Sequence, residues 1–233
     1  MVAGVGFGLS PTGTFATFDN HAGVSSNTLP LTVISTLSAA SVNGAFVAAG
    51  DANEVGSPGI GNVGKLIVTE VAPWASGNSP YAADWFEVTN VGGAAVDMTG
   101  WRMDDNSNSF AVSVPVVGVG SVAPGQSVIL IEGTSTTAAN FVTAWFGGVP
   151  PAGFVIGSYT GSGVGLSSTS DAVNLFNPSG TLITGVQFGA STTGYTFDNT
   201  AGLATVTTLS VAGVNGAFVS PDNIETGSPG TTH

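Results

Sequence analysis

The sequence contains no cysteine and almost no basic residues. Lys65 and Arg102 are its only two positive side chains, against 14 acidic residues among 233, and the formal net charge is −12. Without cysteine, neither disulfides nor thiolate-bound zinc can form. Because proteins hold phosphate groups and anionic membranes with Lys and Arg, the composition argues against nucleic acid as a partner.

Long hydrophobic runs are also missing. No stretch of 18 apolar residues occurs, so we expect no insertion into a membrane as a helix. No basic region followed by an apolar one stands at the start, so no signal peptide is visible. Charged residues make up only 7% of the chain, but its 42% hydrophobic residues fall in short alternating runs, which are typical of a folded β protein.

The pattern predicts an all-β fold with one short helix at residues 135–145. The candidate strands are short, rich in β-branched and aromatic residues, and bounded by Gly, Pro, Asn or Ser clusters. Such spacing is typical of a sandwich or barrel, with Trp85 and Trp101 expected in its core. The candidate strands cover residues 2–7, 65–71, 85–90, 100–104, 127–132, 172–176 and 183–188.

Residues 4–59 and 185–230 share one frame of motifs. Each contains, in order, G-V-x-F-G, F-D-N-x-A-G, T-L-S, V-N-G-A-F-V and E-x-G-S-P-G. The second copy follows a long body, whereas no body precedes the first. We therefore expect three parts: residues 1–62, equivalent to the end of a preceding repeat; residues 63–189, a β-sandwich; and residues 190–233, a tail that repeats the first part.

Ordered motifs between residues 65 and 189 resemble the lamin tail domain family, including its bacterial extracellular members. The motifs are I-V-T-E-V at 67–71, D-W-F-E-V-T-N at 84–90, V-D-M-T-G-W at 96–101, D-D at 104–105, V-A-P-G at 122–125, G-L-S-S at 165–168, D-A-V-N-L at 171–175 and V-Q-F-G at 186–189. The resemblance implies an immunoglobulin-like β-sandwich. It also implies a non-catalytic module, often repeated or attached to secreted enzymes and surface proteins. The two β-rich tails, internal repeats of each other, lie outside the family core.

No cofactor is required by the sequence, and calcium is the one candidate. Asp104, Asn106 and Asn108 place oxygen ligands at alternate positions, as a calcium loop does. The Gly and Glu of an EF-hand are absent there, and Asp and Asn also favour ordinary turns. The residues therefore predict either a metal loop or, preferably, a structural turn.

A second acidic group recurs just before each G-S-P-G. Asp51 and Glu54 precede the first, and Asp222 and Glu225 precede the second. A calcium ion or a contact between units at this loop would explain why it carries acids twice. Duplication of an ordinary polar loop explains the recurrence equally well.

Glu70 and Glu87 have the residue type of paired glycosidase carboxylates. Both lie inside predicted strands, and no cleft can be argued from their spacing. A structural role, with Arg102 as an ion-pair partner for one of them, is therefore favoured. His21 and His233 are isolated, and no catalytic triad, phosphate loop or zinc spacing is present. We expect the protein not to be an enzyme.

Two functions remain. The first is a structural or adhesive module of a bacterial extracellular or cell-surface protein, arranged in tandem or assembling head to tail as a fibre. Val5 and Phe7 align with Val186 and Phe188 of the last sandwich strand. The first strand would thus lack a parent domain and would pair with another copy's sheet, unless the chain is a fragment of a tandem array. The alternative is a calcium- or carbohydrate-binding accessory module of a secreted enzyme.

Overall fold

The structure, a computed structural model, describes residues 63–231 and, before them, residues 6–7, 15–16, 33–34, 46–48 and 51–56. The chain divides into two compact units. One contains the first 65 residues with two short loops, 91–96 and 123–125, and the other contains the rest.

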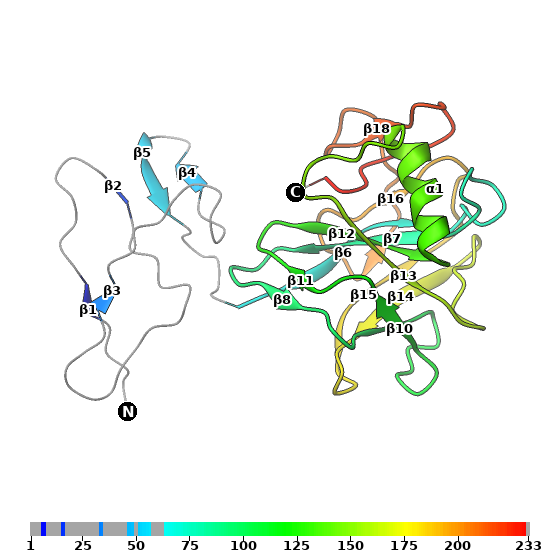
Figure 1. The fold of residues 1–233 in the computed structure, drawn as a ribbon, viewed down its shortest axis with the longest axis horizontal. Helices are drawn as coiled ribbons and strands as arrows, with labels where there is room; N and C mark the ends of the chain where they lie inside the picture. Colours follow the sequence, from blue (N-terminus) through cyan, green and yellow to red (C-terminus); the bar gives the residue numbers. More distant parts are fainter. Residues whose placement is uncertain are drawn as a thin grey trace. The chain divides into compact units, whose positions relative to one another are not determined.

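The larger unit is built around one ten-stranded sheet (Figure 1). In spatial order its strands are β16 (Phe197–Asp198), β6 (Leu66–Ala72), β7 (Trp85–Asn90), β12 (Ser127–Glu132), β13 (Val155–Tyr159), β10 (Val114–Val117), β9 (Arg102–Asp104), β14 (Asp171–Phe176), β15 (Leu182–Phe188) and β17 (Thr205–Val206). Because β15 also lies close to β6, the sheet nearly closes on itself. The fold is β-rich with one helix and consistent with the predicted immunoglobulin-like sandwich.

One helix and two short pairs of strands lie outside the ten-stranded sheet. The helix α1 (Ser135–Phe146) ends at Gly147, whose left-handed backbone, with φ of 62°, suits glycine. Two short pairs of strands complete the list: β8 (Val96–Asp97) with β11 (Ser121–Val122), and β18 (Phe218–Val219) with β19 (Thr226–Gly227).

The smaller unit contains five described strands. β1 (Gly6–Phe7) pairs in parallel with β3 (Val33–Ile34), while β5 (Asp51–Gly56) lies between β2 (Phe15–Ala16) and β4 (Phe46–Ala48). The predicted strand at 2–7 is described only at its last two residues.

Most predicted elements of the larger unit are confirmed. The strands at 85–90 and 127–132 match β7 and β12 at both ends, and the helix is one residue longer than predicted. β10 and β13 were missed because Pro115 interrupts the first and Gly157 weakens the second as strand signals.

Both faces of the central strand β7 are buried, since all six of its side chains lie below the surface. Phe86 contacts Tyr159 on the inner face. On the outer face, Trp85 packs edge-on against Phe141 and Trp145 of α1, with ring centroids 5.3 and 6.0 Å apart. Other parts of the chain must therefore pack on the outer face. The helix α1 packs only on the part of that face around Trp85.

Candidate functional site

A pair of carboxyl groups lies on the outer face beside this aromatic cluster. Glu70 of β6 is the register partner of Glu87 of β7, and the two side chains are each 0% exposed. A β-bulge between Val68 and Glu70 interrupts the pairing here. Because the bulge adds one residue, Thr69 and Glu70 both lie opposite Glu87 instead of alternating between faces.

The hydrogen bonds to these carboxyl groups come mainly from a distant part of the chain. Ser228 N–H donates to Glu70 Oε1 at 2.7 Å, and Gly230 N–H donates to Glu87 Oε2 at 2.6 Å. Thr196 Oγ1 also donates to Glu70 Oε1, whereas Thr69 donates to Glu87 from within the sheet. The C-terminal segment, defined as residues 190–231, thus covers the remainder of the outer face.

Burial changes the acidity of both groups. It raises the pKa of Glu70 from 4.5 to about 7, although the hydrogen bonds from Thr196 and Ser228 act in the opposite direction. Burial, and then the nearby charge of Glu70, raise the pKa of Glu87 well above 4.5. Glu70 Oε2 is buried without a hydrogen-bond partner, so no donor stabilises a negative charge on that oxygen.

A third buried carboxyl group belongs to the C-terminal segment itself. Tyr81 donates its hydroxyl hydrogen to Glu225 Oε2 at 2.6 Å. The same hydroxyl accepts hydrogen bonds from Trp85 Nε1 at 2.8 Å and Trp145 Nε1 at 3.4 Å. Burial raises the pKa of Glu225 to about 7. Tyr81 therefore connects the acidic residue of E-x-G-S-P-G to the aromatic cluster of the sandwich.

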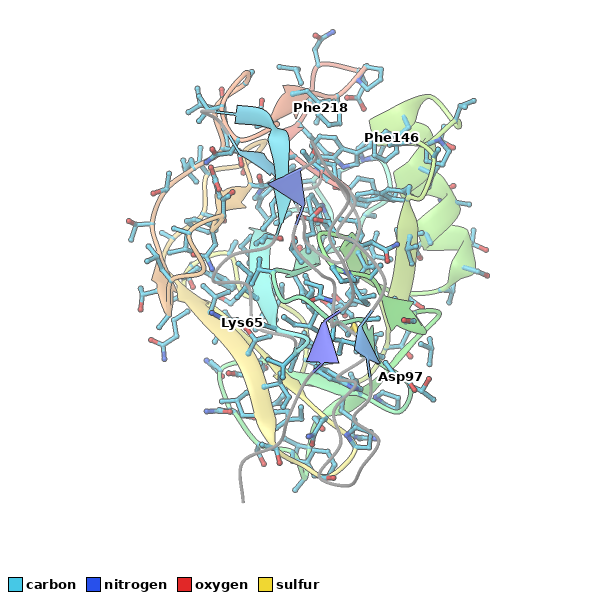
Figure 2. The ribbon with its side chains drawn as sticks, turned by 90° about the vertical axis from the view of Figure 1, so that its left-hand side faces the viewer. Lys65, Asp97, Phe146 and Phe218 are labelled. Carbon is cyan, nitrogen blue, oxygen red and sulfur yellow. The ribbon has the colours of Figure 1, made fainter. Side chains whose placement is uncertain are left out.

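Apolar and backbone contacts extend this attachment. Phe218 packs edge-on against Trp145 at 5.4 Å and lies 6.1 Å from Phe146, at the same end of the sandwich (Figure 2). Asn199 Nδ2 donates to the backbone oxygen of Val68 at 2.7 Å. The segment is consequently held by polar groups of β6 and β7 and, at one end, by aromatic rings.

Comparison with known proteins agrees with this architecture. The sequence profile of the Lamin Tail Domain family matches residues 61–190, more than half of the chain. The chain belongs to the lamin tail domain family. No curated protein matches the sequence. The match ends where the C-terminal segment begins, so the groups that cover the two glutamates come from outside the family region.

The carboxyl pair of this lamin tail domain is closed to substrates. Both glutamates are fully buried beneath the C-terminal segment, so their arrangement does not offer the accessible carboxyl groups that a glycosidase needs. The expected ion pair with Arg102 is wrong. Arg102 lies on β9, donates from Nε to Ser113 Oγ at 2.8 Å, and stands over the ring of Phe110.

The candidate calcium loop forms a turn after β9 of the lamin tail domain. Asp104 Oδ2 accepts hydrogen bonds from Ser107 and Ser109, while Asp104 Oδ1 is buried without a partner. Asn106 contributes its backbone N–H to Asp171, and Asn108 adopts a positive φ of 47°. No three acidic or histidine side chains gather as a metal site within the part of the chain that is described.

Of the two recurring acidic loops, only the one with Asp222 and Glu225 has described side chains. Asp222 accepts hydrogen bonds from Ser220 and Ile224 in a tight turn, and Glu225 binds Tyr81. Asp51 and Glu54 begin and continue β5, but their side chains lie outside the described part. The same holds for His21 and His233.

Two of the four residues predicted for self-association lie on β15. Val186 and Phe188 are buried on β15, whose outer edge pairs in parallel with β17 at Gln187 and Phe188. The edge of β6 is likewise paired with β16. Phe7 lies on β1, and Val5 lies outside the described residues. Addition of a strand at the edge of β15 would therefore have to displace β17.

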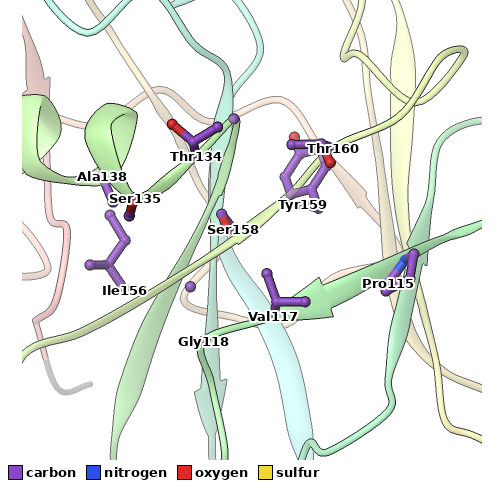
Figure 3. Close-up of a pocket in the computed structure, with 12 residues that line it drawn as sticks. Pro115, Val117, Gly118, Thr134, Ser135, Ala138, Ile156, Ser158, Tyr159 and Thr160 are labelled. Carbon is purple, nitrogen blue, oxygen red and sulfur yellow. The ribbon is translucent and has the colours of Figure 1, made fainter.

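A separate hollow of about 580 Å³ opens beside the start of α1 (Figure 3). Val117, Ser135, Ile156 and Ser158 are among its lining residues, and none of the described lining residues is acidic or a histidine. The hollow thus offers apolar and hydroxyl contacts but no acid–base pair. No described helix has the length and hydrophobicity needed to cross a membrane.

The sequence analysis identified both glutamates but did not predict that the C-terminal segment packs over them. The signal was present in E-x-G-S-P-G, because Glu225, Ser228 and Gly230 all contact the sandwich. Motif spacing does not reveal that donors 126 to 158 residues away in the chain bind Glu70 and Glu87.

Proposed function

We propose that this protein is a non-catalytic structural module of a bacterial extracellular or cell-surface protein. In this role lamin tail domains follow one another in series, or neighbouring copies join head to tail. The N-terminal segment, residues 1–62, would be equivalent to the closing segment of a preceding unit. The partners of the protein would be other copies of the chain or adjacent repeats.

The supporting observation is a coincidence of strand registers. Three strand pairings in the N-terminal segment have counterparts in the later part of the chain, between β15 and the C-terminal segment or within that segment. In each case the paired residues align by motif, and the two strands run in the same relative direction. They are Phe7 with Ile34 and Phe188 with Val206 in parallel, Ala16 with Val55 and Tyr195 with Thr226 in parallel, and Phe46 with Gly56 and Phe218 with Gly227 antiparallel. Ordinary polar linkers would have no reason to repeat these registers.

The scarcity of basic residues suits an exposed structural material. Trypsin cleaves after Lys and Arg, and the chain has only Lys65 and Arg102. Arg102 is partly buried on β9 and bonded to Ser113. The buried, covered state of Glu70 and Glu87 also favours a binding or structural role over catalysis.

Light scattering of the full chain over a range of concentrations tests the proposal. We expect an average mass that rises with concentration, and a variant lacking residues 1–59 that remains monomeric, since the N-terminal segment would provide the contact between copies. Equal masses for the two proteins at all concentrations would refute head-to-tail association.

A further inference from the structure

We propose that the outer face of the sandwich accepts the N-terminal segment of a second copy of this chain in place of its own C-terminal segment. The receiving surface comprises Glu70, Tyr81, Glu87 and Trp145, the residues that hold the C-terminal segment within one chain. This inference rests on the proposed function and specifies the surface through which neighbouring copies join.

The residues that make these contacts recur in the N-terminal segment. They are Thr196, Asn199, Phe218, Glu225, Ser228 and Gly230, which align with Thr17, Asn20, Phe46, Glu54, Ser57 and Gly59. Each aligned pair has the same residue type. The N-terminal segment therefore carries a hydroxyl donor for Glu70, an acid for Tyr81 and an aromatic ring for Trp145.

Exposed positions differ between the copies in some places and agree in others. Tyr195 is 44% exposed and aligns with Ala16, whereas Val219 is 44% exposed and aligns with Val47. The proposal therefore stands on the six contact residues, which are identical in the two segments.

Replacement, rather than addition, is the route that the sheet permits. The edges of β6 and β15 are both paired with strands of the C-terminal segment, so an incoming segment would take over those pairings as in domain swapping. The resident segment has the advantage of its covalent tether. Exchange of the two segments should therefore be slow, and the fraction of chains that bind a second copy should increase with protein concentration.

Cross-linking between two full-length variants tests the proposal, because the chain has no cysteine of its own. Exposed Thr143 of α1 and Pro221 of the C-terminal segment line one surface hollow. Ala49 and Pro221 each lie two residues after a V-N-G-A-F-V motif. Thr143→Cys protein is mixed with Ala49→Cys protein, incubated at high concentration and treated with a short bismaleimide. Leu182→Cys on β15, 44% exposed, replaces Thr143→Cys in the control.

We expect at least about tenfold more covalent dimer from the Thr143→Cys mixture than from the control. The double variant Thr143→Cys/Pro221→Cys shows that the reagent spans the hollow, by an intramolecular link. If this double variant links but the mixture gives no more dimer than the control, the inference is wrong. Association in light scattering without the cross-link would leave the proposed function standing and refute this surface alone.

Discussion

Glu70 and Glu87 face each other across β6 and β7, and each accepts a backbone hydrogen bond from the G-S-P-G motif, through Ser228 and Gly230 respectively. Burial of two neighbouring carboxyl groups is costly unless they are protonated or hydrogen-bonded. The bonds from the C-terminal segment offset part of this cost. The segment is therefore part of the domain's structure and not an appended tail.

The carboxyl pair should make the protein most stable in mild acid. Because the pKa of Glu70 is about 7 in the folded protein and 4.5 ordinarily, the folded state binds more protons between these values. Stability therefore falls as pH rises from about 4.5 to about 7, by up to about 3 kcal/mol for Glu70 alone. Urea unfolding at a series of pH values measures this slope.

Glu70→Gln should reduce that slope by the contribution of Glu70, while Glu87 and Glu225, whose pKa values are also raised, keep the rest. The amide oxygen can still accept from Thr196 and Ser228, while the group can no longer ionise. Asp97→Asn is the control, because Asp97 is exposed and its pKa is lowered by hydrogen bonds with Thr99. An unchanged slope between pH 5 and pH 7.5 in Glu70→Gln would contradict the assignment.

Sequence patterns predicted the sandwich well and its cover poorly. Local alternation of residue types marks strand residues such as Trp85 and Val88, so both ends of β7 were predicted correctly. The bulge at Thr69 and the burial of Glu70 depend on partners from Thr196 to Gly230, which no local pattern encodes. Arg102 was misassigned because adjacent strand motifs in the sequence are not adjacent in the sheet: β9 lies between β10 and β14.

Tyr81→Phe should destabilise the protein by about 2–4 kcal/mol, because it leaves Glu225 and two indole N–H groups without their shared partner. Tyr159→Phe is a matched control, since the hydroxyl of Tyr159 is buried without a hydrogen-bond partner. We expect the control to be neutral or slightly stabilising in thermal unfolding. Equal losses in the two variants would argue against the Tyr81–Glu225 connection.

Gly227→Ala should loosen the C-terminal segment. A Cβ atom at this position would lie 2.5 Å from Glu70 Oε1 and 2.9 Å from Thr196, which predicts a loss of about 1–3 kcal/mol. At Gly189 a Cβ would meet nothing within 4 Å, so Gly189→Ala should change stability by less than about 0.5 kcal/mol. Chemical unfolding measures both. A Gly227→Ala variant as stable as Gly189→Ala would show that the segment does not pack as described.

Hydrogen exchange at the amides of Ser228 and Gly230 tests the central claim most directly, that the C-terminal segment is held on the sandwich by two buried glutamates. In the full chain we expect both amides to exchange as slowly as those of β6 and β7, because they donate to Glu70 and Glu87 in a buried site. Exchange at both amides as fast as in an unstructured peptide, while β6 and β7 remain protected, would contradict the account.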